Sequence, residues 1–231
     1  MIVDHDNFRV LEVLENREKA TVKAYLQQAR DGGLLAGVAE VTVDMWDAYD
    51  TAAREVFPDA AVTVDRFHVM KNFQEGLCKA RRELQKGLSA EERKLLKGSR
   101  WLWTTNPENL SPEKRAELES LQLRFPELAR ISERRESLRT IFEDKAIADP
   151  SEGRRRLQGW MDETRELGIK ALDRFLGTLG NWMDGIANYF RSRSSNGRTE
   201  GINRGIRAIV WRMFGMAIFT NFRLCVLNAF G

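Results

Sequence analysis

The strand-like segments of this chain all lie within its first 65 residues, and helical patterns fill the remainder. The stretches MIVDH and FRVLEVLE, around the turn DN, predict two short strands. VAEVTVD, which ends at Asp44, and AAVTVD, which ends at Asp65, predict two more. Helices are expected between them, over residues 19–30 and in MWDAYDTAAREVF. Strand–helix alternation followed by helices alone predicts a helix-rich α/β fold.

The block from about residue 71 to residue 180 is charged, rich in Leu, Glu, Arg and Lys, and has no strand pattern. It predicts a helical subdomain, and we expect Trp101, Trp103 and Trp160 in its core because large aromatic side chains are usually buried. The last part of the chain predicts two helices joined near MFGM.

Composition excludes some classes of protein. A hydrophobic content of 42% and a charged content of 31% indicate a globular chain rather than a disordered or membrane-embedded one. No apolar run is long enough for a bilayer, and the first residues do not resemble a secretory signal, so a cytoplasmic protein without membrane contact is expected. Cys78 and Cys225 lie far apart without metal-ligand spacing, which favours reduced thiols.

Arginines are concentrated near the C-terminus, although the net charge is only +3. The planar guanidinium group binds two phosphate oxygens at once, so such a cluster indicates a nucleic-acid partner. The alternative is a solvated helix face, which would explain any one of these residues. The candidate DNA-binding residues are Arg191, Arg193, Arg198, Arg204, Arg207 and Arg212.

Two aspartates follow predicted strands. Asp44 and Asp65 each come directly after an alternating segment, where α/β proteins tend to bind ligands and metals. His68, three residues after Asp65, would share a face with it if a helix begins there. The alternative is that both aspartates cap the helices that follow them.

Glu200 lies in SSNGRTEGINRGIR, among glycines, asparagines and arginines. It is no part of a capping box, because Gly197 stands where Ser or Thr would be needed. The apolar stripe of this helix turns Glu200 partly away from the core; its residues are Ile202, Ile206, Ile209 and Val210. Two strand-end aspartates and a helical glutamate are a donor set for divalent metals in phosphodiester chemistry.

Two blocks carry a family resemblance. VTVDMWDAYDTAAREVFPDAAVTVDRFHVMKNF and SNGRTEGINRGIRAIVWRMFGM together resemble the DDE transposases of bacterial insertion sequences, in the ISL-three branch. The resemblance implies a ribonuclease-H-like catalytic fold with an all-helical insertion before the catalytic glutamate. It implies that residues 1–70 form the first part of the catalytic fold and that residues 71–180 form the insertion. Residues 181–231 are expected to form the C-terminal helices of the catalytic fold, which carry Glu200.

The resemblance also implies site residues. Asp44 matches the second aspartate of the D, D, E triad and Glu200 its glutamate, so these two are the expected catalytic residues and ligands of Mg²⁺ or Mn²⁺. Asp65 and His68 match a motif that organises the active site or the DNA path. The glutamate motif further includes Asn196, Gly197, Gly201 and Asn203.

This chain departs from the family pattern in two respects. The family's first triad aspartate lies on a strand before IVDHDNFRVLEVLE, and here Asp4 and Asp6, the nearest acids, match the wrong end of the hairpin. The resemblance therefore implies a chain truncated at its N-terminus, with its first strand, zinc-binding and helix-turn-helix regions missing. Trp211 stands where the family usually has a basic residue.

Truncation predicts impaired activity, because the first aspartate bridges the two metal ions of such sites. It also predicts self-association through an exposed sheet edge.

Three functions remain open. The first is DNA transposition at element ends and target DNA, by a nucleoid-associated enzyme. The second is a DNA-binding remnant that modulates intact transposase, and the third is a related nuclease or resolvase.

Overall fold

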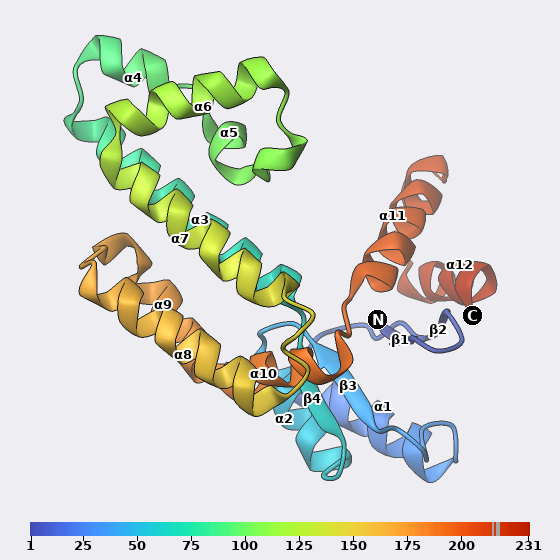
Figure 1. Ribbon diagram of the computed structural model, residues 1–231. Helices are drawn as coiled ribbons and strands as arrows, with labels where there is room; N and C mark the ends of the chain where they lie inside the picture. The colour runs from blue at the N-terminus through green and yellow to red at the C-terminus, as the bar shows by residue number, and fades with distance from the viewer. Residues whose placement is uncertain (214, 216–217) are drawn as a thin grey trace. The chain divides into compact units, whose positions relative to one another are not determined.

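The computed structural model describes residues 1–213, 215 and 218–231, with the side chain of Arg198 excepted. Figure 1 traces the chain from blue at the N-terminus to red at the C-terminus. The chain forms two compact units. One comprises Met1–Asp65 together with Arg193–Gly231, and the other comprises Arg66–Ser192. Part of the expected helix junction at MFGM, namely residues 214 and 216–217, lies outside the described residues.

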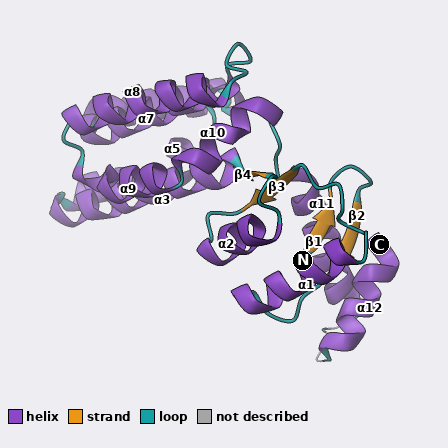
Figure 2. Cartoon of the chain, turned by 90° about the horizontal axis from the view of Figure 1, so that it is seen from below, coloured by secondary structure: helices purple, strands orange, loops and turns teal. Residues whose placement is uncertain are grey.

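The first unit contains two small sheets, drawn in orange in Figure 2. β1 (Ile2–Asp4) and β2 (Arg9–Glu12) form an antiparallel hairpin. β3 (Glu40–Val43) and β4 (Ala61–Val64) are parallel neighbours, and such a pair needs a crossover connection, which a helix supplies here. The four strands that the alternation predicts are thus confirmed, and the described strands form two pairs rather than one sheet.

Two helices connect these strands, and both predicted helices are confirmed. α1 (Lys19–Asp31) precedes β3, and α2 (Asp47–Val56) joins β3 to β4. They bury one apolar cluster against each other, onto which side chains of the hairpin and β3 also pack. Its buried members are Val22, Leu26, Ala52, Val56 and Phe57. The connection therefore has the arrangement of a β–α–β unit.

The hairpin also packs on α11 (Gly197–Arg212) and α12 (Phe219–Phe230). Val10, Val13 and Val226 form the buried centre of that second cluster. Gly205 permits the close approach of the two helices, because a Cβ atom there would lie 2.6 Å from the ring of Phe230. The cluster ties the helix that carries the glutamate motif to the N-terminal strands.

An ion pair reinforces this packing. Arg223 of α12 donates from Nε and one terminal nitrogen to both carboxylate oxygens of Glu12 at the end of β2. The hydrogen bonds from Arg223 lower the pKa of Glu12 against the opposing effect of partial burial. A bidentate pair of this kind fixes orientation as well as distance.

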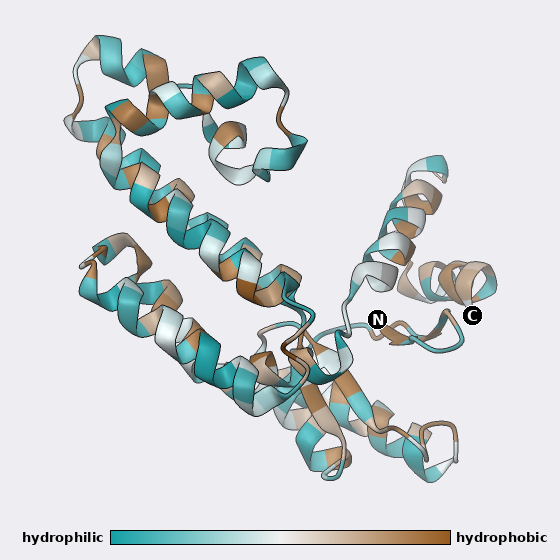
Figure 3. Cartoon of the chain, in the orientation of Figure 1, coloured by the Kyte–Doolittle hydropathy of each residue, from teal (hydrophilic) through white to brown (hydrophobic). Residues whose placement is uncertain are grey.

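The second unit, as far as described, contains helices and no strand. Brown and teal alternate along its long helices in Figure 3, as expected for amphipathic helices. Its α-helices are α3 (Arg66–Gly87), α4 (Ala90–Leu96), α5 (Arg100–Thr104), α6 (Pro112–Arg124), α7 (Pro126–Glu143), α8 (Pro150–Glu166), α9 (Asp173–Asn181) and α10 (Met183–Ser192).

Aromatic side chains fill the core of this unit. Phe73, Trp160 and Phe175 pack edge to face, with ring centroids 5.0 to 6.1 Å apart. Phe142 and Phe190 stack with their planes 6° apart. Such pairs add stability beyond the burial of their area.

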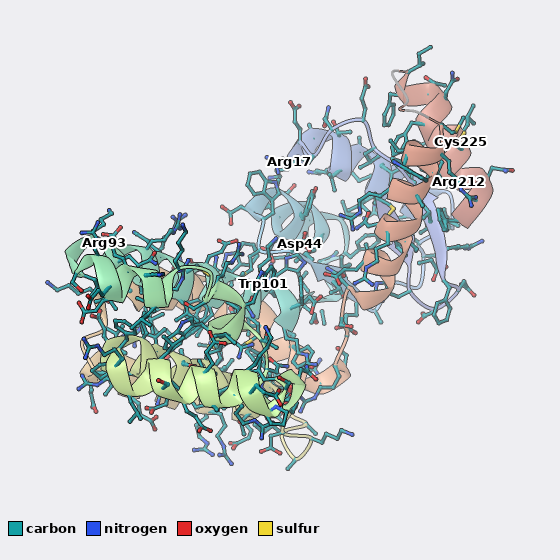
Figure 4. The ribbon with its side chains drawn as sticks, turned by 90° about the horizontal axis from the view of Figure 1, so that it is seen from above. Arg17, Asp44, Arg93, Trp101, Arg212 and Cys225 are labelled. Atoms are coloured by element: carbon teal, nitrogen blue, oxygen red, sulfur yellow. The ribbon has the colours of Figure 1, made fainter. Side chains whose placement is uncertain are left out.

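One prediction for this core is wrong. Trp103 and Trp160 are buried, whereas 69% of Trp101 is exposed, and Figure 4 labels it on α5. Trp101 and Trp103 are two positions apart on a short helix, so their side chains point to opposite sides of it. A helix with one buried face cannot bury both.

Both cysteines are free, which confirms the expected thiols. Among the described residues, no helix combines the length and the apolar character that crossing a membrane requires.

Candidate active site

Asp44 and Asp65 are neighbours at one edge of a sheet. Val43, the last residue of β3, is the register partner of Val64, the last residue of β4. Each aspartate comes directly after its strand, so the parallel pairing brings both to the carboxyl end of the sheet. This is the edge at which open α/β sheets bind ligands.

Asn196 joins these two aspartates. Its backbone N–H donates to Asp65 Oδ2 at 2.8 Å, and its side-chain Nδ2 donates to Asp44 Oδ1 at 3.0 Å. Asn196 is the residue before α11, the helix that carries Glu200. One residue of the glutamate motif therefore contacts both strand-end carboxylates.

Asp44 is not the N-cap residue of the helix that follows it. The N-cap residue of α2 is Trp46, which makes no side-chain cap hydrogen bond. Asp65 is 1% exposed, and one of its oxygens accepts the Asn196 bond. A buried carboxylate requires such hydrogen bonds because it has lost its hydration.

Glu40 is a further acid on this sheet. Its Oε1 accepts from the hydroxyl of Thr63, and its Oε2 accepts from the hydroxyl of Ser194 at 2.9 Å. The segment before α11 is thus tied to the sheet at two points, Ser194 and Asn196. Sequence reasoning missed Glu40 and Ser194. Alternate residues of a strand point to the same face, so the spacing of Glu40 and Asp44 could have predicted that both acids lie on one face.

Glu200 lies in the first turn of α11, where its backbone N–H donates to the carbonyl of Asn196 at 2.8 Å. Its side chain is half-buried and forms no hydrogen bond or ion pair with any other described residue. Within the part of the chain that the structure describes, no three His, Cys, Asp or Glu side chains gather closely enough to hold a metal ion. The described site is an aspartate pair joined by Asn196 to the start of the glutamate helix.

The carboxylate of Asp44 acts on its surroundings. Burial, and after it the negative charge of Asp44, raise the pKa of the Tyr49 hydroxyl, while the positive charge of Arg17 opposes them. Figure 4 labels Arg17 and Asp44 in this unit. The candidate site therefore contains cationic as well as anionic groups.

Other predicted site residues lie on several elements. Gly197, Gly201 and Asn203 belong to α11. His68 lies in α3 of the second unit, with its ring edge-on to that of Phe67 at 5.7 Å. The helix that was expected to begin after Asp65 does begin there, at Arg66.

Asp4 is engaged in the hairpin turn. Its carboxylate accepts from the backbone N–H groups of Asp6 and Asn7 and from the side chain of Asn7, and these bonds lower the pKa of Asp4. An aspartate in this arrangement stabilises a turn. The structure gives Asp4 a local role at the hairpin end.

The candidate DNA-binding arginines are divided between the two units. Arg204, Arg207 and Arg212 are exposed on α11 and make no ion pair with another described residue. Arg193, in the segment before this helix, has a left-handed backbone with φ 56°. Arg191 ends α10 of the second unit. The side chain of Arg198 lies outside the described residues.

Trp211 adds a large apolar surface to the same helix. It is 80% exposed, beside Arg212, which Figure 4 labels. The C-terminal half of α11 therefore presents both guanidinium groups and an indole ring to solvent.

Comparison with known proteins gives a consistent result. The sequence model of one protein family, the ISL3 group of DDE transposases, matches residues 1–226. The transposase for insertion sequence element IS1001 of Bordetella parapertussis is 28% identical over 233 residues, which cover 100% of this chain and 56% of that protein. The transposase for IS1557 of Mycobacterium tuberculosis is 25% identical over 238 residues, which cover 93% of this chain and 52% of that protein.

The chain thus spans about half the length of the curated relatives that it matches. No solved structure matches it.

Proposed function

We propose, from the premise that this chain belongs to the ISL3 family of DDE transposases, that its Asp44 and Glu200 are two of the carboxylates at which an insertion-sequence transposase cuts and joins DNA. The observation that carries this proposal is the double hydrogen bond of Asn196 to Asp44 and Asp65. It connects the strand-end acids to the start of the helix that bears Glu200. The two relatives are named as transposases of insertion sequences, which supports the same chemistry.

The donor set fits Mg²⁺ or Mn²⁺. Both ions prefer carboxylate oxygens, and Mg²⁺ is commonly held by one or two carboxylates together with substrate phosphates and water. Asp44 and Glu200 are the proposed protein ligands. When bound, the metal ion stabilises charge on the phosphate oxygens during phosphoryl transfer. Asn196 orients Asp44, and Asp65 holds the backbone of Asn196 in place.

The proposed fold is ribonuclease-H-like, with the helical unit as an insertion before Glu200. The order of hairpin, α1, β3, α2 and β4 supports it. In that fold the strands belong to one sheet, whereas the described strands form two separate pairs. Each described strand pairs with one neighbour only, and such open edges favour the proposed self-association, which sedimentation velocity measures.

Glu200→Gln and Asp44→Asn test the proposed chemistry. With Mg²⁺ and DNA that carries the element ends, both variants should lose strand cleavage and joining, because each removes a charged metal ligand. Isothermal titration with Mn²⁺ gives a second readout, in which both variants should bind the ion more weakly than the unaltered chain. Glu200→Gln should change thermal stability little, since the side chain of Glu200 makes no hydrogen bond or ion pair with another described residue.

The matched control is Glu15→Gln, which removes an exposed carboxylate elsewhere in the same unit. It should retain metal binding and DNA joining. Equal Mn²⁺ affinity of Glu200→Gln, Asp44→Asn and the control would contradict the proposed metal site.

The exposed arginines of α11 favour a second candidate, a DNA-binding protein that modulates intact transposase without chemistry of its own. Arg204, Arg207 and Arg212 need no metal ion to bind phosphates. This candidate predicts DNA binding that weakens steeply with salt, without Mg²⁺-dependent nicking. Glu200→Gln then retains or gains affinity, because the substitution removes a negative charge near the DNA.

A further inference from the structure

Arg17 lies in the segment between β2 and α1 and stacks on an aromatic ring next to the candidate site. Its guanidinium carbon is 4.6 Å from the centroid of the Trp46 ring. Trp46 follows Asp44 by two residues, and its backbone N–H donates to the carbonyl of Asp44 at 2.7 Å. The position of this stack is therefore tied to the strand end that carries Asp44.

Arg17 forms no hydrogen bond or ion pair with any described residue, although it is exposed and acids are near it in sequence. Arg9, Arg30 and Arg54 of the same unit all bind carboxylates. Stacking on an indole uses the face of a guanidinium group and leaves its in-plane N–H donors available. Arg17 is thus a pre-oriented donor group without a protein acceptor in the described part of the chain.

Trp46 itself is 44% exposed at the beginning of α2. A cation over the face of a partly exposed aromatic ring is attracted to it by a cation–π interaction. The same contact reduces the rotational freedom of the long arginine side chain, which lowers the entropic cost of binding a ligand.

The charges of Arg17 and Asp44 both act on Tyr49. Asp44 and Arg17 shift the pKa of the same Tyr49 hydroxyl in opposite directions, Asp44 upward and Arg17 downward. A site of carboxylates repels the phosphates of DNA. A positive charge held on Trp46, two residues after Asp44, offsets part of that repulsion and attracts the DNA backbone.

From these contacts we infer that Arg17, held by Trp46, binds a backbone phosphate of DNA beside the strand-end carboxylates. The inference rests on the proposed DNA chemistry and adds a phosphate-binding residue outside α11. If the stack served only to fasten the segment before α1 to α2, Arg17 would contribute to stability and not to DNA binding.

The test measures binding of a short fluorescent DNA duplex to the full chain by anisotropy, in a series of KCl concentrations without divalent metal. Arg17→Ala should weaken binding roughly tenfold, as for one lost charge-assisted hydrogen bond. The slope of log affinity against log salt should become shallower by about one, since one phosphate contact is lost. Trp46→Ala should weaken binding while keeping the wild-type slope, because the charge remains.

Arg54→Ala is the matched control. Arg54 is an exposed arginine on α2 whose guanidinium pairs with Asp50 of the same helix. Its replacement should change affinity and salt slope less than the replacement of Arg17 does. Circular dichroism of each variant shows whether it is folded, and Arg17→Gln serves if Arg17→Ala is not.

The outcomes separate this inference from the proposed function. If the unaltered chain does not bind DNA, the proposed function fails. If it binds DNA and a folded Arg17 variant keeps both affinity and slope, the stack is only a structural fastening and the inference is overturned. A shallower slope for Arg17 variants together with an unchanged slope for Trp46→Ala supports it.

Discussion

At the scale of single residues, the site depends on Asn196. Its two bonds reach Asp65 and Asp44 across 131 and 152 positions of the sequence. The sequence predicts Asp44 and Asp65 at strand ends from alternation alone, but a motif residue without charge gives no signal that it contacts both. Asn196 entered the expected site only through the family resemblance.

Asn196→Ala tests the side-chain half of this arrangement. The substitution removes the donor to Asp44 and keeps the backbone bond to Asp65, so we expect a loss of about 1 to 2 kcal/mol in the free energy of unfolding. Urea denaturation followed by circular dichroism measures it. Asn221→Ala, at an exposed position of α12, is the control and should be nearly neutral. Equal stability of both variants would show that the bond to Asp44 contributes nothing.

At the scale of elements, hydrophobic patterns place the helix and strand positions well. The helical pattern of the sequence is interrupted near residues 87–89, 104–112, 126 and 149–153, and these interruptions coincide with the ends of α3 and α5 and the beginnings of α7 and α8. Proline and glycine mark these breaks because they disfavour a continuing helix. The orientation of a short helix is harder to predict, as α5 shows, because a few residues contain too little periodicity to identify the buried face.

Helix α8 offers a matched pair of glycines. A Cβ atom at Gly153 would clash with the ring of Phe190, whereas Gly159 has open space. Gly153→Ala should destabilise the chain by about 1 to 3 kcal/mol, since Phe190 is buried and stacked on Phe142.

Gly159→Ala is the control for that change. It should stabilise the chain by up to about 1 kcal/mol, the gain in helix propensity at an exposed position. Thermal unfolding of the two variants should therefore shift in opposite directions. A shift in the same direction would mean that the close approach of α8 and α10 does not limit the size of residue 153.

At the scale of the whole molecule, the chain leaves the first unit after Asp65 and returns to it at Arg193. Within that unit, Asn196 donates to Asp65 at 2.8 Å, so the two points of connection lie close together. A segment inserted between neighbouring chain ends can fold by itself without distorting its host.

Replacing residues 66–192 by a short Gly/Ser linker tests this separation. We expect the shortened chain to retain helical and strand signals and a cooperative urea transition, because little loop entropy is needed to join adjacent ends. Circular dichroism of the shortened chain beside the full chain measures it. An unfolded shortened chain would show that the first unit requires the helical unit for stability.

The sequence by itself determined the strands, the principal helices and the carboxylates that follow β3 and β4. These features depend on side-chain periodicity and on chain-breaking residues, which act over a few positions. Tertiary structure alone decided that Asn196 joins Asp44 to Asp65, that Ser194 binds Glu40, and that Arg17 stacks on Trp46. These contacts join residues that are distant in sequence, so they exist only after the packing of helices and sheets has brought them together.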